Sequence, residues 1–378
     1  MIIRNCNIIY EDKIEKGSIL IRDGKIEKIN PVNIVDEVFD ANGLYLSPGF
    51  IDIHIHGAGG YDTMDGNVAA LNSISKVIVE HGTTSFLPTT MTVSIEEINS
   101  AMKVIKKLKE EGTEGANILG GHLEGPFISP KAIGAQNPNY LLQSSIEAYK
   151  KIVEGCEDAV VSLTLAPEIE GAKELIEYVR AKGIVCSVGH TKATYNEVIE
   201  GINSGITHST HLFNAMTGFN HREPGCVGAI FDTDITTETI ADGIHISYPA
   251  LKLAFKVKTT NKVILVSDSM MACCMEDGCY SLGGQRVYVV NGAARLENGS
   301  LAGSVLTIDK AIANVYKNCG IPLHEVVKMA TYNPAKHCNV QDSKGVIKEG
   351  YDADLVLFDE NITVKKVFVN GKEVYSNK

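Results

Sequence analysis

Two histidines, His54 and His56, end an apolar run that starts at Pro48 and breaks at Gly57. On a β-strand, residues two positions apart point to the same face, so both imidazoles would project together from the end of the strand. Imidazole nitrogens placed in this way can collect a divalent metal ion. Two histidines at an exposed strand end can also make ordinary hydrogen bonds, so this spacing supplies only half of a metal site.

Four further side chains that could bind or assist a metal ion also follow predicted strands: Glu124, His190, His211 and Asp268. Two neutral imidazoles and one carboxylate form a three-ligand catalytic set for zinc or a similar ion, with one position left open for water. A single histidine is more often structural. Several such donors at strand ends favour a catalytic centre.

The segments that must position these residues alternate between strand and helix patterns, with helices expected at 94–111 and 172–182. Eight strands are expected, at residues 51–56, 84–87, 118–123, 160–165, 184–188, 206–210, 239–241 and 263–267. This count predicts an α/β fold, a (β/α)8 TIM-like barrel, whose active residues lie at the C-terminal ends of the strands. A doubly wound open sheet is the alternative, because strands are easily miscounted.

Short β-rich runs with turn signals occupy both ends of the chain. Residues 17–22 are followed by Asp23-Gly24, and the same texture returns at 353–358 and 364–369, before Asn370-Gly371. We expect an antiparallel sheet at the start and one small β-sandwich-like domain built from residues 1–48 and 345–378. Residues 49–344 would form the metal-dependent catalytic barrel.

Composition restricts the partners and the compartment. A net charge of −11 argues against a nucleic-acid or anionic-membrane surface, so an anionic substrate would need a local basic pocket. No run is typical of a targeting or membrane-spanning segment, which predicts a cytoplasmic protein. The nine cysteines indicate free thiols. Cys273, Cys274 and Cys279 share one expected loop, but they lack the further pair that a tetrahedral thiolate site needs.

Six motifs can be compared with known families. They are His54-x-His56, HLEGPF at 122–127, VGH at 188–190, THLFNAM at 210–216, ADGIH at 241–245 and VSD at 266–268. Together with the closing run at 345–356, they resemble the N-acetylglucosamine-6-phosphate deacetylase family of the amidohydrolase superfamily. The resemblance extends over nearly the whole chain, and the combination is far more specific than any single motif.

The resemblance implies hydrolysis of N-acetyl-D-glucosamine 6-phosphate to D-glucosamine 6-phosphate and acetate, in amino-sugar catabolism and cell-wall sugar recycling. It implies that Glu124, His190 and His211 bind the principal divalent ion, zinc or iron, and that Asp268 is the general acid/base. It also implies a homodimer in which Arg222 contributes to phosphate recognition in the partner subunit's site. The other implied substrate contacts are Ala135, Gln136, Asn214, Ala215, Asp242, Gly243, Ile244, His245, Leu301, Ala302 and Gly303.

Elementary chemistry agrees with these roles. An amide is a poor electrophile, and a divalent ion can activate water and stabilise charge on the carbonyl oxygen. Asp268, kept ionised by its cationic surroundings, would take a proton from the water and return it to the departing amine. Arg222 and His245 fit an anion clamp for the phosphate. Without the resemblance, Arg222 would be interpreted as an ordinary surface charge.

Two positions separate the chain from the family pattern. Gln136 stands where family members often carry histidine, and glutamine can donate a hydrogen bond but cannot become cationic. Some members of the family that this chain resembles lack a complete His-x-His pair and look mononuclear. Because His54 and His56 are both present, we expect a capacity for two ions, with Glu124 as the bridge.

Two other functions remain open at this stage. One keeps the superfamily but changes the substrate to another, unphosphorylated N-acetyl amino sugar or a cyclic amide. The other is a non-catalytic assembly protein built on the same barrel. That second alternative predicts damage to the ligand set, whereas every proposed donor is intact.

Overall fold

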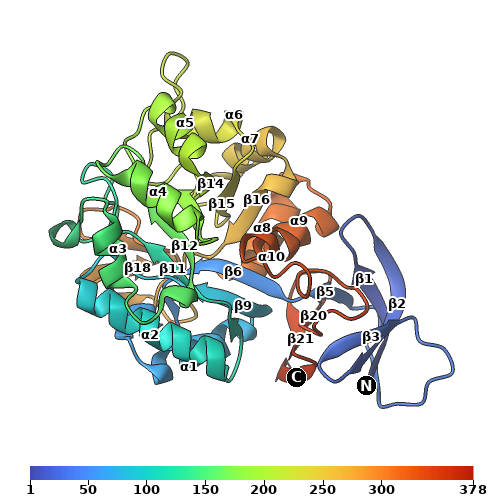
Figure 1. Ribbon diagram of the computed structural model, residues 1–378. Coiled ribbons are helices and arrows are strands. Elements are labelled where there is room, and N and C mark those ends of the chain that lie inside the picture. Colours follow the sequence, from blue (N-terminus) through green and yellow to red (C-terminus); the bar gives the residue numbers. More distant parts are fainter. Residues whose placement is uncertain (378) are drawn as a thin grey trace.

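The computed structural model describes residues 1–377, and its central feature is a ring of parallel strands (Figure 1). These strands are β6 (Phe50–Ile55), β9 (Thr83–Pro88), β10 (Asn117–Ile118), β11 (Gly121–Glu124), β12 (Val160–Leu165), β13 (Val185–Val188), β14 (Ile206–Ser209), β15 (Thr236–Ile240) and β16 (Val263–Val266). They pair in the orders β10-β9-β6 and β11-β12-β13-β14-β15-β16. Parallel bridges between Thr89 and His122 and between Ile55 and Ser269 join the two sheets at both edges. This TIM-barrel-like closure excludes the open doubly wound sheet.

One expected strand, residues 118–123, is interrupted. It divides into β10 and β11, with Gly120 between them at a φ of +149°. A Cβ atom on Gly120 would lie 2.6 Å from the carbonyl oxygen of Ala159, so the neighbouring backbone leaves room only for glycine. The chain then re-enters the sheet as β11, which ends at Glu124.

Helices surround the parallel strands (Figure 1). They are α1 (Val68–Val79), α2 (Ile95–Glu111), α3 (Ile146–Ile152), α4 (Ala172–Arg180), α5 (Tyr195–Ser204), α6 (Gly225–Asp232), α7 (Tyr248–Lys258), α8 (Ile308–Cys319), α9 (Leu323–Ala330) and α10 (Tyr332–His337). The helix expected at 94–111 is confirmed, and the reciprocal capping box of Ser94 and Glu97 sets its start. Buried side chains such as Phe86 and Leu163 fill the interface between strands and helices.

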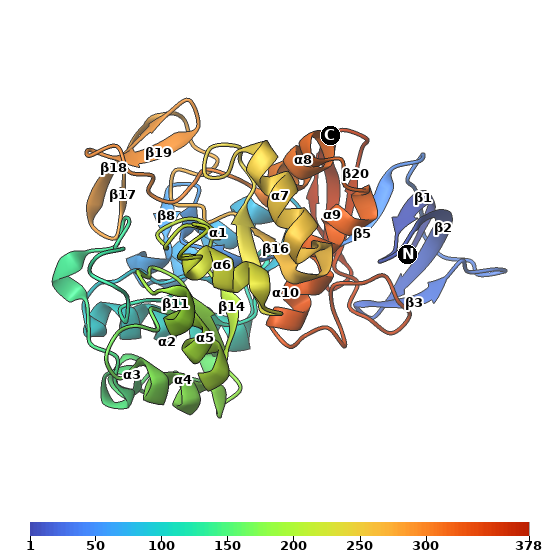
Figure 2. The same ribbon diagram turned by 90° about the horizontal axis from the view of Figure 1, so that it is seen from above.

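Strands from both ends of the chain form one eight-stranded sheet beside the barrel (Figure 2). They are β1 (Ile2–Ile9), β2 (Ile14–Arg22), β3 (Lys25–Ile29), β4 (Val38–Asp40), β5 (Tyr45–Pro48), β20 (Leu355–Phe358), β21 (Val364–Val369) and β22 (Lys372–Ser376). The sheet is mixed rather than antiparallel, because β4 and β5 return beside β1 in the same direction. β5 leads directly into β6, so this sheet holds the start of the strand that carries His54.

A second, unexpected sheet follows the last barrel strand. It is a three-stranded antiparallel sheet of β17 (Gly278–Leu282), β18 (Gln285–Val290) and β19 (Ala293–Leu296). In β18 the buried Val287 and Val289 alternate with exposed residues, a period-2 pattern that predicts a strand. Cys279 lies on β17 whereas Cys273 and Cys274 precede it, so the expectation of one shared loop is wrong. A short ribbon of β7 (Gly57–Ala58) and β8 (Tyr61–Asp62) follows β6.

Among residues 1–377, no helix combines the length and apolar character needed to cross a membrane.

A buried polar pair joins β6 to the end of β16, where the ring closes. The hydroxyl of Ser267 donates to Asp52 Oδ2 at 2.5 Å, and the backbone N–H of Ser267 donates to Asp52 Oδ1 at 3.3 Å. Both residues are 2% exposed. Because Asp52 lies two residues before His54 and Ser267 directly precedes Asp268, this pair holds two candidate site residues in register.

Replacement of Ser267 by alanine tests this contact. Ser267→Ala removes a hydroxyl donor from a buried carboxyl group, and we expect the free energy of unfolding to fall by about 1–3 kcal/mol. Urea denaturation measures the change. Ser100→Ala on the exposed face of α2 is the matched control, expected within about 0.5 kcal/mol of the parent. Equal stability of the two variants would contradict this role.

Candidate metal centre

A cavity of about 400 Å³ opens at the C-terminal ends of the barrel strands. Twelve of the residues singled out by the sequence line it: His56, Glu124, Ala135, Gln136, His190, His211, Asn214, Ala215, His245, Asp268, Leu301 and Gly303. His54 is fully buried behind the cavity wall. The expected convergence of donors from β6, β11, β13, β14 and β16 is therefore present.

Glu124, His190 and His211 form the first donor cluster. Glu124 Oε1 lies 3.2 Å from His190 Nε2 and 3.0 Å from His211 Nε2, and the two nitrogens are 3.1 Å apart. Tetrahedral ligands at about 2.0–2.1 Å from an ion lie roughly 3.4 Å from one another, so this spacing approaches that of a metal site. His190 Nδ1 lies 2.9 Å from the carbonyl oxygen of Ala132, which suits an Nδ1–H donor and directs the Nε2 lone pair at the cluster.

His54, His56 and Asp268 form the second donor cluster. The two Nε2 atoms are 3.3 Å apart, and Asp268 Oδ1 lies 3.6 Å from that of His54 and 3.4 Å from that of His56. Glu124 lies between the clusters, because its Oε1 is 3.4 Å from His54 Nε2 and its Oε2 is 3.3 Å from His56 Nε2. The two clusters could hold one ion each, with Glu124 shared between them.

The arrangement of the donor atoms favours binding of a cation over direct hydrogen bonds between these atoms. When His190 is neutral with its proton on Nδ1, its Nε2 and the Glu124 carboxylate are both acceptors, which repel unless a proton or a metal ion lies between them. His211 also directs its Nε2 at the cluster, although its buried Nδ1 has no hydrogen-bond partner among residues 1–377. The residues therefore suit a divalent ion, as the sequence predicted.

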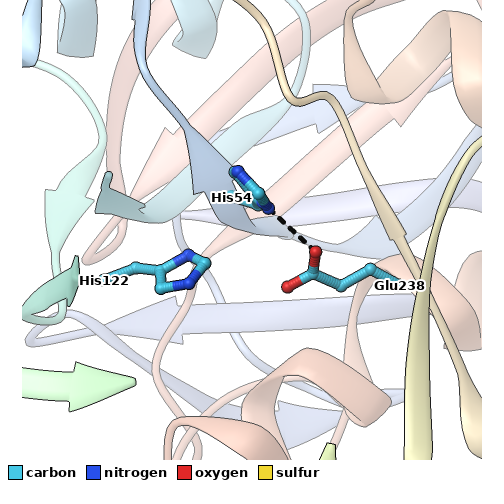
Figure 3. Close-up of side chains that lie close together, drawn as sticks. All are labelled: His54, His122 and Glu238. Atoms are coloured by element: carbon cyan, nitrogen blue, oxygen red, sulfur yellow. Dashed lines mark hydrogen bonds and ion pairs between the residues drawn. The ribbon is translucent and has the colours of Figure 1, made fainter. Parts of the chain in front are cut away.

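Glu238 contacts His54 at the ring nitrogen Nδ1, which is not the nitrogen in the second cluster (Figure 3). This buried carboxylate on β15 has its Oε2 2.8 Å from His54 Nδ1 and its Oε1 3.3 Å from His208 Nε2. Sequence reasoning missed Glu238, although a charged residue inside the otherwise uncharged strand TTETI was a usable signal. A carboxylate behind a ligating histidine fixes the tautomer and the ring orientation.

His122 lies beside this pair but has other partners (Figure 3). Its Nε2 is 2.7 Å from the hydroxyl of Thr164, and its Nδ1 is 3.4 Å from that of Thr89. Burial and the neighbouring His54 lower the pKa of His122 to about 3. We interpret His122 as a neutral hydrogen-bonding residue of the barrel interior rather than a ligand.

The backbone is strained at three of the candidate residues. His190, His211 and Asp268 have φ values of 47°, 30° and 47°, in the left-handed region that residues other than glycine rarely adopt. Each such residue costs about 1–3 kcal/mol and persists only where the surrounding structure enforces it. The turn occurs directly after each strand and directs the side chain into the cavity.

The charges of the clusters stabilise one another. Burial opposes ionisation of Glu124, but His54 and His190 lower the pKa of this carboxyl well below its usual range. Likewise, burial opposes ionisation of Asp268, but His54 and His56 lower its pKa. Burial alone would lower the pKa of His54, but Glu238, Asp268 and Glu124 raise it to about 9. The ionised carboxylates therefore favour positive charge at the centre.

Gln136 is in contact with Glu124. Its side-chain amide donates to Glu124 Oε2 at 2.6 Å, and its carbonyl oxygen accepts from the backbone N–H of Thr92 at 2.7 Å. The side chain is 2% exposed. In this position Gln136 fixes the orientation of a candidate metal ligand, and its expected contact with substrate stays a prediction.

Some of the remaining predicted substrate residues line the cavity, and others hydrogen-bond to the residues that line it. His245 lines the cavity, and Asp242 holds it, with Oδ2 2.6 Å from His245 Nδ1 and Oδ1 accepting from the backbone N–H of Ile244 and of His245. Asn214 donates to the carbonyl oxygen of His211 at 3.2 Å.

Five of the predicted substrate residues lie outside the cavity lining: Arg222, Asp242, Gly243, Ile244 and Ala302. Ala302 is fully buried, between Leu301 and Gly303 in the chain. Arg222 is exposed in the segment between β14 and α6, which projects beyond the helices (Figure 1). Its expected role in a partner subunit's site stays a prediction.

Comparisons with known proteins give one consistent result. The sequence profile described as "Amidohydrolase family" matches residues 45–374. The N-acetylglucosamine-6-phosphate deacetylase of Lysinibacillus sphaericus is 37% identical over 98% of this chain and 97% of its own. The N-acetylgalactosamine-6-phosphate deacetylase of Escherichia coli O157:H7 is 32% identical over 96% of each chain. The crystal structure of N-acetylglucosamine-6-phosphate deacetylase from Pasteurella multocida superposes with a TM-score of 0.94 and 33% identity, covering 100% of this chain and 99% of that one. This chain belongs to the amidohydrolase family.

Proposed function

We propose that this protein hydrolyses N-acetyl-D-glucosamine 6-phosphate to D-glucosamine 6-phosphate and acetate. The observation that carries the proposal is the complete donor set of Glu124, His190, His211 and Asp268 around one cavity, in a chain that matches such deacetylases over nearly its full length. A non-catalytic assembly protein would not need to retain this set. The relative that acts on N-acetylgalactosamine 6-phosphate makes the epimeric sugar phosphate the alternative substrate to test.

The proposed cofactor is a divalent ion, zinc or iron, held by Glu124, His190 and His211. When bound, it supplies an activated water and stabilises negative charge on the acetamide oxygen. His54 and His56 would hold a second ion, with Glu124 between the two sites. The Nδ1 contacts of His54, His56 and His190 with acceptor oxygens support this assignment, because each leaves Nε2 free for an ion.

The proposed proton carrier is Asp268. Its carboxylate faces the donor clusters, and the low pKa that His54 and His56 impose keeps it ionised before reaction. It would accept a proton from the nucleophilic water and deliver it to the departing amine. His245, held by Asp242, and Asn214 would orient the sugar, and Arg222 would contact the phosphate of a substrate bound by the partner subunit of a homodimer.

The other proposals concern organisation. We assign residues 49–344 to the catalytic barrel and residues 1–48 with 345–378 to a small β domain, which is supported by the single sheet that both ends form. A cytoplasmic location is supported by nine free cysteines.

Acetate release tests the substrate. The protein is reconstituted separately with zinc and with ferrous iron. We expect it to release acetate from N-acetylglucosamine 6-phosphate faster than from two other compounds, unphosphorylated N-acetylglucosamine and N-acetylgalactosamine 6-phosphate. Arg222→Ala should lower kcat/KM for the phosphorylated sugar by about 10- to 150-fold, since a hydrogen bond to a charged group contributes about 1.5–3 kcal/mol. Arg4→Ala, on β1, is the control. Equal rates with and without the phosphate would reject the proposed substrate.

Asp268→Asn tests the proton carrier. We expect kcat to fall by about 10²- to 10⁴-fold, because an amide cannot accept the proton, while the ion held by Glu124, His190 and His211 is retained. Acetate release and elemental analysis give the two readouts. Asp234→Asn, whose carboxylate is fully exposed, is the control. Near-normal turnover of Asp268→Asn would show that another group carries the proton.

Glu238→Gln tests the number of ions. We expect the parent protein to bind two equivalents, and the variant to bind the second 10- to 100-fold more weakly because His54 loses its anionic partner. Anaerobic metal analysis after dialysis against graded chelator measures both. His54→Asn should also lose one equivalent, and Glu297→Gln is a charge-matched surface control. A single tight equivalent in the parent, unchanged in His54→Asn, would rule out the second ion.

A further inference from the structure

A cysteine, a histidine and an aspartate are aligned outside the metal centre. The Sγ atom of Cys274 lies 3.3 Å from His81 Nε2, and His81 Nδ1 lies 3.1 Å from Asp309 Oδ2. Three segments far apart in the chain supply them: the loop after β16, the turn after α1 and the first turn of α8. Cys274 is an exposed residue, whereas Cys273 beside it is buried.

The aspartate is itself fixed. Its Oδ1 accepts from the hydroxyl of Thr307 at 2.5 Å and from the backbone N–H of Lys310 at 2.8 Å, which leaves Oδ2 for His81. His81 is thereby oriented with Nε2 toward the sulfur. A thiol within reach of a histidine that a third group orients is the usual arrangement of an activated nucleophile.

The charged and titratable groups around the sulfur favour the thiolate. Cys273 lies with its Sγ 3.7 Å from that of Cys274, and Lys310 adds positive charge nearby. Hydrogen bonds from Cys273 and His81 outweigh burial and lower the pKa of Cys274 to about 5. Burial opposes the charging of His81, but Asp309 and Cys274 raise its pKa to about 10. Both shifts favour the thiolate and imidazolium form of the pair.

Cys273 differs from its neighbour. It is buried, and its Sγ lies 3.6 Å and 3.5 Å from the carbonyl oxygens of Val305 and Leu306, which compete with the Cys274 sulfur for the one thiol hydrogen of Cys273. The hydrogen bond with Cys274 and, after it, burial raise the pKa of Cys273 well above its usual value. Of these two residues, Cys274 is the exposed one, and it is the one whose thiol pKa is lowered.

We propose that Cys274 is a nucleophilic modification site that reacts with hydroperoxides and with soft carbon electrophiles. With hydrogen peroxide, the thiolate attacks one oxygen, an S–O bond forms and the O–O bond breaks. The sulfur is oxidised by two electrons to sulfenic acid as the peroxide is reduced. The departing hydroxide takes the proton of the His81 imidazolium and leaves as water. With iodoacetamide, the thiolate forms an S–C bond and iodide leaves.

Alkylation rates provide the first test, and Cys279 is an internal control. Cys279 is also exposed, but its thiol has no hydrogen-bond partner among residues 1–377. Iodoacetamide labelling of the metal-loaded protein, followed by peptide mass spectrometry, gives both rates. At pH 6 we expect Cys274 to react about tenfold faster than Cys279. A thiol with a pKa of about 5 has a roughly 300-fold larger thiolate fraction than a typical free cysteine, and the lower nucleophilicity of a weaker base partly offsets this difference. From pH 6 to 8 its rate should stay nearly constant, whereas an ordinary thiol gains about tenfold per pH unit. Equal rates with the same pH slope at both cysteines would overturn the proposal.

Variants separate the histidine's effect from simple exposure. His81→Gln can still form a hydrogen bond but cannot become cationic, so labelling of Cys274 should regain the steep pH dependence. Asp309→Asn should shift the profile in the same direction. His324→Gln, on α9, is the control, and thermal unfolding checks that each variant is folded. An unchanged flat profile in folded His81→Gln would exclude His81 as the activating group.

Trapping with dimedone after peroxide treatment tests the oxidation. In the parent protein, the dimedone adduct should be about tenfold more abundant on Cys274 than on Cys279. In His81→Gln, the amount of adduct on Cys274 at pH 6 should be lower than in the parent. Adducts of equal abundance on both cysteines would contradict a specific site.

Discussion

The structure depends on one electrostatic constraint: a single buried carboxylate, Glu124, is surrounded by imidazole nitrogens. Four Nε2 atoms lie 3.0–3.4 Å from its two oxygens. A buried carboxylate among neutral lone pairs is unfavourable, so positive charge must occupy the centre as protons or as metal ions. The surrounding residues are arranged accordingly, because Gln136 donates to Glu124 and the outer nitrogens of three histidines face acceptor oxygens.

The fold meets this constraint by bringing strand ends to one edge. Parallel strands in a closed ring place residues separated by more than a hundred positions within contact distance, and the bridge from Ile55 to Ser269 closes the ring next to the site. The cost is local strain, since His190, His211 and Asp268 turn out of their strands in a left-handed conformation. Burial of apolar side chains such as Phe86 and Leu163 between the strands and the helices contributes the stability that offsets it.

The sequence alone was sufficient to select candidate site residues that lie at or just after the ends of the barrel strands. Each of the candidate metal donors ends or directly follows a barrel strand, so periodicity and the barrel rule together predicted them. The sequence was insufficient to predict which side chains contact one another when they come from strands or loops on different sides of the barrel. Nothing local to Glu238 indicates that it faces His54, and nothing local to His81 indicates Cys274 or Asp309. The β17–β19 sheet is a different case, because the alternation at Val287 and Val289 was readable but no element was predicted for residues 285–296.

The two donor clusters are not equivalent, and the difference bears on Asp268. The first is complete without the proposed proton carrier, whereas the second includes Asp268 itself, 3.4 Å from His56 Nε2. Positive charge at the second cluster favours the carboxylate and so weakens it as a base, whether protons or an ion provide that charge. Glu238 would oppose this effect, because its negative charge next to His54 reduces the positive electrostatic potential that the second cluster exerts on Asp268. An ion bound by His54 and His56 would therefore lower the basicity of the group proposed to move the proton, so the number of bound ions would affect the rate and the pH range of the proposed reaction.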